Sequence, residues 1–115
     1  MEKYIRTKDK IVKNPYLGVE QGIPVFELTA DNMFLTKKDI VKTSNNLEDL
    51  CDGFVVKDYI PTKPLYFDTK LQAQQFVYKN GVQNDNRVEI YGAIWTDKGL
   101  IYVAKMNNKG NLELI

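Results

Sequence analysis

The sequence predicts an α+β fold with a mainly antiparallel sheet, in a single domain over residues 1–115. Residues 87–115 alternate between two sets of side chains over three short runs, which is the period of a β-strand. Two other stretches, residues 45–53 and 68–79, carry apolar residues at helical spacing. The chain has 115 residues, of which 43% are hydrophobic and 27% charged, and these values suit one globular domain.

The C-terminal run predicts a three-stranded antiparallel meander. Its strands are expected at Arg87–Thr96, Leu100–Met106 and Asn111–Ile115. Gly99 and Gly110 each follow an Asp-Lys or Asn-Lys pair, which is typical of a type I turn closed by a left-handed glycine and a bulge.

Short strands are expected in the first half of the chain. Tyr4–Thr7 and Ile11–Lys13 predict a hairpin, although their turn lacks a glycine. Val25–Thr29 and Met33–Thr36 predict a second hairpin, because the intervening Ala-Asp-Asn tolerates a positive φ. Tyr16–Gly22 has no readable pattern.

A strand at Ile40–Thr43 is expected to lead into a short helix. Asn45 as N-cap with Glu48 three residues later resembles a capping box, and Gly53 suits a left-handed C-cap. An extended run, Phe54–Lys57, follows. The apolar residues of this short helix lie at helical spacing: Leu47, Leu50, Cys51 and Phe54.

A longer helix is predicted from Asp68 or Thr69 to Lys79, ended by Asn80-Gly81. Pro61 and Pro64 predict a connector before it, and Val82–Asn86 a polar loop after it. Its apolar stripe contains Ala73, Phe76 and Val77.

The residue types exclude most catalytic arrangements, so the chain is predicted not to be an enzyme and to need no cofactor or metal. It has no histidine and one cysteine, Cys51, and its glycines are isolated rather than grouped in a phosphate-binding loop. Cys51 is expected to point inward as a small hydrophobe, not a nucleophile. The carboxylate pairs could do acid–base work or hold a hard cation, although ordinary surface carboxylates are the favoured interpretation. These pairs are Asp49 with Asp52, and Asp31 with Asp39.

The chain is expected in the cytoplasm. Its first ten residues carry six charged side chains and no apolar run, which predicts no signal peptide. No window approaches the roughly 20 apolar residues of a membrane span. A single cysteine fits a reducing compartment. The net charge of +1 gives no general attraction to nucleic acid or anionic membranes.

Two groups of residues are candidate binding sites. Tyr91, Trp95 and Tyr102 are predicted to share one sheet face and to bind a partner, because the opposite face is aliphatic and suits helix packing. The alternative places these aromatics in the core. A second group of basic residues could contact nucleic acid, although the solvated sides of edge strands are the favoured interpretation. Its members are Arg6, Lys8, Lys10, Lys37 and Lys38.

The block Tyr91–Asn107 resembles one at the end of small uncharacterised proteins of phages and prophages in Gram-positive bacteria. Tyr4–Asp9, Asn46–Asp52 and Phe54–Val56 are similar to segments of the same proteins. The resemblance covers about half of the chain and leaves out residues 14–36 and 59–86. In those proteins a glycine commonly follows the aspartate of the first segment, where this chain has Lys10, so its first turn is expected to differ. The resemblance implies a phage setting and carries no assigned activity.

The preferred function is therefore a non-catalytic phage or prophage accessory protein that binds a host macromolecule, for example to inhibit a host defence. Its expected partner is a host or phage protein in the cytoplasm of a bacterial host, with no membrane involved. The alternative is a small nucleic-acid-binding module that uses the N-terminal lysines and the sheet aromatics. An enzyme working through carboxylates is the weakest hypothesis.

Overall fold

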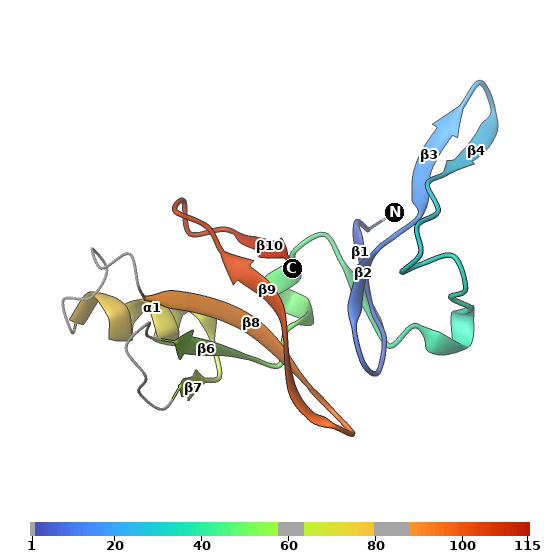
Figure 1. Cartoon of the computed structure of the whole chain (residues 1–115). Coiled ribbons are helices and arrows are strands. Elements are labelled where there is room, and N and C mark those ends of the chain that lie inside the picture. Colours follow the sequence, from blue (N-terminus) through green and yellow to red (C-terminus); the bar gives the residue numbers. More distant parts are fainter. Residues whose placement is uncertain (1, 58–63, 80–87) are drawn as a thin grey trace. The chain divides into compact units, whose positions relative to one another are not determined.

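The computed structural model describes residues 2–57, 64–79 and 88–115, and Figure 1 shows the course of the chain. The residues divide into two compact units, one ending at Leu50 and one beginning at Cys51. The α+β class with antiparallel pairing is confirmed. The expectation of one domain stays a prediction. Pro61 and the predicted loop Val82–Asn86 lie outside the described residues.

The N-terminal unit contains a three-stranded antiparallel sheet in the order β2-β1-β5, with strands Ile11–Lys13, Tyr4–Arg6 and Lys42–Ser44. The predicted first hairpin is confirmed. Thr7 replaces the missing glycine in its turn: the Thr7 N–H donates to the Lys10 carbonyl at 2.9 Å, and the Thr7 hydroxyl accepts the Lys10 N–H at 3.2 Å. A side-chain oxygen thus closes this turn.

The predicted second hairpin is wrong. Strand β4, Ile23–Phe26, pairs antiparallel with the strand that precedes it, β3 at Tyr16–Glu20. No element was predicted for β3, because its sequence has no clear pattern. Gln21 and Gly22 both have positive φ, 50° and 79°, so they form a tight hairpin turn that the sequence analysis did not predict. A turn is present at residues 30–34 as expected, but the strand predicted after it, Met33–Thr36, is not formed. The Asn32 side chain, which is 3% exposed, accepts the Thr29 N–H in this turn.

The predicted short helix is present only as a 3-10 helix, η2 at Leu47–Leu50, and its predicted cap and stop are wrong. Asn45 does not cap it, since its side chain accepts the Lys3 N–H; Asn46 instead accepts the Glu48 N–H. Gly53 belongs to a strand and is not a left-handed cap. Another 3-10 helix, η1 at Lys37–Asp39, shifts the following strand two residues from its predicted start.

The C-terminal unit is built on a five-stranded sheet in the order β10-β9-β8-β6-β7. The three predicted strands are present as β8, β9 and β10, and Gly99 and Gly110 have the expected positive φ of 105° and 82°. However, the sheet is not a three-stranded meander, because β6 pairs antiparallel with β8 and β7 with β6. The strands span Gly53–Lys57 (β6), Leu65–Phe67 (β7), Glu89–Thr96 (β8), Gly99–Met106 (β9) and Leu112–Leu114 (β10).

The predicted longer helix is confirmed as α1, Lys70–Lys79, which lies beside β6 in Figure 1. Its cap is Thr69, whose hydroxyl accepts the Gln72 N–H at 3.1 Å. One face of the sheet packs against the helix and forms a core with it. Cys51 packs against this core, as predicted. The buried core residues are Phe54, Val56, Ala73, Val77 and Ile90. Among the helices of the described residues, none is long and apolar enough to cross a membrane.

Candidate functional site: the aromatic face of the C-terminal sheet

Four aromatic side chains lie on the sheet face opposite α1. Strand pairing places Val55 opposite both Tyr66 and Tyr91, and Ala93 opposite Tyr102. Because side chains alternate along a strand, these residues point to one side while the core residues Phe54 and Val56 point to the other. We call this surface the aromatic face and define it as Tyr66, Tyr91, Trp95 and Tyr102.

Tyr91 and Tyr102 stack beside an irregularity in the pairing of β8 with β9. The pairing passes from Gly92 with Ala104 directly to Ala93 with Tyr102, so Val103 is the extra residue of a β-bulge. The ring centroids of Tyr91 and Tyr102 are 5.0 Å apart with an interplanar angle of 17°. This stacked pair is half-buried. The predicted proximity of these two residues is therefore confirmed.

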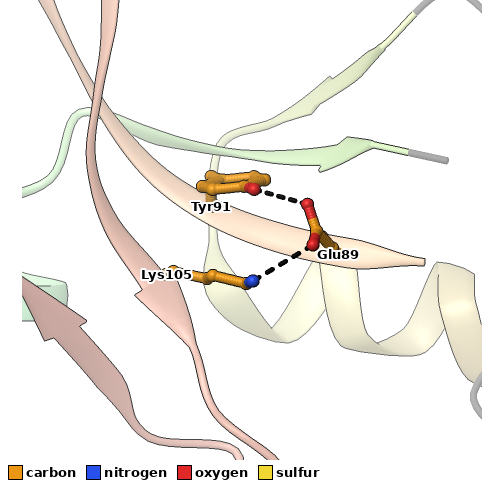
Figure 2. Close-up of polar contacts among 3 residues, drawn as sticks. All are labelled: Glu89, Tyr91 and Lys105. Carbon is orange, nitrogen blue, oxygen red and sulfur yellow. Dashed lines mark hydrogen bonds and ion pairs between the residues drawn. The ribbon is translucent and has the colours of Figure 1, made fainter. Parts of the chain in front are cut away.

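Charged groups lie beside both tyrosines, and Figure 2 shows the two at Tyr91. The Tyr91 hydroxyl donates a hydrogen bond to the Glu89 carboxylate, whose other oxygen accepts one from Lys105 at 3.0 Å. Lys57 Nζ lies 6.0 Å from the Tyr102 ring centroid, a cation–π distance. The hydroxyl group of Tyr91 is thus already bonded within the chain.

These contacts shift two pKa values. The hydrogen bond to Glu89 raises the pKa of Tyr91 to about 12, because it favours the protonated phenol beside a negative charge. The hydrogen bonds from Tyr91 and then Lys105 lower the pKa of Glu89. Both groups therefore keep their ordinary charge states at neutral pH.

Trp95 does not join the stacked tyrosines but pairs with Tyr66 of β7. Their ring centroids are 5.8 Å apart with an interplanar angle of 49°, and the Trp95 Nε1–H donates to the Tyr66 hydroxyl at 3.2 Å. Trp95 is 54% exposed and Tyr66 38% exposed. The alternative that placed Trp95 in the core is wrong, and this pair is the more accessible half of the aromatic face.

Backbone and side-chain bonds from Asp52 hold the pair in place. The Tyr66 hydroxyl donates to the Asp52 carbonyl at 3.1 Å, and the Trp95 backbone N–H donates to the Asp52 carboxylate at 2.7 Å. Below them, Gly53 leaves room for the Tyr66 ring: a Cβ at Gly53 would lie 2.1 Å from Tyr66 Cζ. Gly53 therefore allows a close approach of the ring to the backbone.

Sequence reasoning missed Tyr66 and the role of Gly53, and it considered Asp52 only as one of a pair of carboxylates, not as a partner of Trp95 and Tyr66. Tyr66 follows Pro64 in the predicted connector, and its only signal was the short aromatic run Leu65-Tyr66-Phe67, which suits a strand. Tyr66 contacts Trp95, 29 positions further along the chain, so no local pattern reveals the pair.

The basic residues predicted to contact nucleic acid lie on separate elements of the N-terminal unit. Arg6 is half-buried in β1 and donates from Nη1 to the Leu50 carbonyl at 3.1 Å, while Lys10 Nζ donates to the Asp31 carbonyl at 2.9 Å. Lys8 is exposed in the β1–β2 turn, and Lys37 and Lys38 are exposed in η1. Two of the five predicted contacts thus bond to the protein's own backbone.

Three of the carboxylates singled out in the sequence, those of Asp39, Asp49 and Asp52, have structural partners. Asp49 accepts the Ser44 hydroxyl at 3.0 Å, and Asp39 accepts the Thr36 backbone N–H at 2.9 Å in a capping box. Across residues 2–57, 64–79 and 88–115, no three or more Cys, Asp or Glu side chains gather to hold a metal ion.

An open hollow of about 540 Å³ lies between β7 and α1. Tyr66, Phe67 and Phe76 supply its aromatic lining, and Asp68 and Lys79 its charged groups.

No family model, curated protein or solved structure matches this chain.

Proposed function

We propose that this chain is a non-catalytic binding protein that recognises a partner protein through its aromatic face. The observation that carries the proposal is the exposure of Trp95, at 54%, beside Tyr66 on the side of the sheet that α1 leaves uncovered. Trp and Tyr supply much of the energy at protein interfaces, since they bring a large contact area at a small entropic cost. The resemblance to phage proteins suggests a host macromolecule in the bacterial cytoplasm, such as a component of a defence system.

The charge distribution favours a protein partner over nucleic acid. Residues 1–50 contain eight basic and eight acidic side chains, and residues 51–115 contain eight and seven. On the aromatic face, Lys105 is neutralised by Glu89 at 3.0 Å. Binding to a phosphate backbone relies on several uncompensated cations, and this distribution does not concentrate them.

The alternative, a nucleic-acid-binding module, draws on the stacked pair of Tyr91 and Tyr102 with Lys57 and Lys105 beside it. Aromatic side chains on a sheet can stack single-stranded bases. Fluorescence anisotropy with single-stranded DNA and RNA tests it. Retention at micromolar concentration or tighter that falls steeply with salt, and is lost on Lys57→Glu, would favour nucleic acid over a protein partner.

Affinity capture from infected host cells tests the main proposal. Tagged wild-type protein, Trp95→Ala and the matched control Tyr78→Ala are compared, with nuclease treatment to remove nucleic acid. Tyr78 is an equally aromatic residue on α1, 75% exposed. Wild type and Tyr78→Ala should capture a partner protein that remains bound after nuclease treatment. Trp95→Ala should bind this partner about 30-fold or more weakly, as expected for a loss of about 2 kcal/mol at an interface.

Stability must be measured on the same variants. Removing a fully buried Trp costs about 3–5 kcal/mol, so half-exposed Trp95 should cost about 1–2 kcal/mol in Trp95→Ala. A folded Trp95→Ala protein that retains the partner as wild type does would refute the aromatic face as the binding surface.

A further inference from the structure

The hairpin of β3 and β4 is a ribbon of two strands in the N-terminal unit (Figure 1). Strand pairing places Tyr16 opposite Phe26 and Val19 opposite Pro24. Paired residues share a face, and Pro24 and Phe26 are two positions apart along β4, so all four side chains lie on one face of the ribbon. The ring centroids of Tyr16 and Phe26 are 5.4 Å apart in an edge-to-face contact there. We call this surface the hairpin face and define it as Tyr16, Val19, Pro24 and Phe26.

The hairpin face exposes apolar side chains and carries no charge. Val19 is 63% exposed and Phe26 is 56% exposed. The charged residue of the two strands, Glu20, lies on the opposite face together with Ile23, with which it is paired. The chain thus presents an uncharged apolar surface on a two-stranded ribbon, which by itself is only marginally stable in water.

The exposed apolar area is sufficient for a weak specific interface. Leu17 and Leu28, which are 60% and 63% exposed, lie next to the hairpin face along the chain. A half-exposed aromatic or branched aliphatic side chain leaves about 100 Å² in water, so these residues together offer about 500 Å² per molecule. Two molecules that cover this area on each other bury about 1,000 Å², which is the lower limit for a specific protein interface.

We propose that the hairpin face packs against the same face of a second copy of this chain, in a two-fold symmetric dimer. Each group near the axis of such a dimer meets its own counterpart, so a face without charges brings no like charges together. The two ribbons stack as a small two-layer sandwich, which supplies the packing that an isolated two-stranded hairpin lacks. The net charge of +1 adds no long-range repulsion between the copies.

This interface goes beyond the proposed function, because the aromatic face belongs to the C-terminal unit and the hairpin face to the N-terminal unit. A second copy as the occupant requires the purified protein to associate with itself, to an extent set by its concentration. A different protein as the occupant leaves the purified chain monomeric. The oligomeric state of the pure protein therefore separates the two occupants.

Sedimentation velocity of the full chain tests the inference, over concentrations from about 1 to 500 µM that bracket an expected dissociation constant of about 10–100 µM. Val19→Glu should weaken the association by at least about 10-fold, because two carboxylates would be brought together in an apolar interface. Val19→Lys should weaken it equally. An equimolar mixture of Val19→Glu and Val19→Lys should associate at least about 10-fold more tightly than either variant alone, since opposite charges then meet across the symmetric interface.

Two matched controls should associate as wild type does. Ile23→Glu places the same charge on the opposite face of the same hairpin, where Ile23 is 66% exposed. Val41→Glu changes the same residue type at a similar exposure, 60%, outside the hairpin but within the N-terminal unit. Far-UV circular dichroism shows whether each variant is folded. Val19→Thr keeps a β-branched strand residue and serves if Val19→Glu does not fold; it should weaken association by at least about 5-fold, because its hydroxyl would be buried without a partner.

Wild-type protein that stays monomeric throughout this range would overturn the inference. So would equal loss of association in Val19→Glu and in either control, or a mixture of the two charged variants that remains as dissociated as each alone. A dimer that Val19→Glu leaves intact would also refute it, because association would then use another surface. None of these results bears on capture of a partner through Trp95, so the proposed function and the dimer stand or fall separately.

Discussion

Replacement of Gly53 by alanine should destabilise the protein, although alanine is ordinarily the better strand residue. Glycine within a strand costs about 0.5–1 kcal/mol relative to alanine, so an unobstructed Gly53→Ala change would be stabilising by that amount. The new Cβ, however, would lie 2.1 Å from Tyr66 Cζ and Oη, and the ring must leave its place. Its departure breaks the bonds to Asp52 and Trp95 and uncovers buried Gly53, at a combined cost of about 2 kcal/mol. The net expected loss is about 1 kcal/mol.

A double-mutant cycle tests this reasoning, with urea unfolding followed by far-UV circular dichroism. In a Tyr66→Ala background the obstruction is gone, so Gly53→Ala should become stabilising by about 0.5–1 kcal/mol. The change of sign between the two backgrounds is the essential result. If Gly53→Ala has the same effect with and without the Tyr66 ring, the contact between ring and backbone does not explain the glycine.

Two further predictions concern the C-terminal sheet. Gly99→Val should cost about 1–3 kcal/mol in the urea assay, because φ is 105° there while no atom obstructs a Cβ; an unchanged unfolding midpoint would contradict the left-handed turn. Tyr91 should ionise with a pKa of about 12, seen as the tyrosinate absorbance of wild type minus that of Tyr91→Phe, and Glu89→Gln should return it toward the usual value of about 10. Since the folded pKa of Tyr91 is raised and that of Glu89 is lowered, this bond stabilises the protein fully between about pH 4.5 and pH 10. The stabilisation is lost as pH rises through about 12, and it is also lost in acid, when Glu89 becomes protonated. A wild-type midpoint near 10 would mean that the bond to Glu89 does not form in solution.

Local sequence patterns predicted the elements whose causes are local. The alternation in β8 and β9 and the glycines of their turns involve neighbouring residues, as do the Thr69 cap and apolar stripe of α1. A sequence predicts a hairpin turn only when its residues are typical of one. Gln21 and Gly22 both have positive φ, but Gln-Gly is not a usual pair for such a turn, whereas Asn-Gly is. The segment at 45–53 has apolar residues at helical spacing, but Gly53 at its end pairs with β8 as part of β6. The helix is therefore limited to the 3-10 helix at Leu47–Leu50.

The candidate site was predicted in part for the same reason. The sequence by itself determined that Tyr91 and Trp95 share a face opposite the aliphatic core positions, because period two is a property of one strand. Only the tertiary structure decided that Tyr102 stacks on Tyr91 across a bulge and that Trp95 turns to Tyr66. Those contacts depend on which strands become neighbours in the sheet, and that order is set by packing between segments far apart in the chain. Gly53 shows the difference most clearly. From the sequence it was predicted to be the C-cap of a helix, whereas in the folded sheet it makes room for the Tyr66 ring.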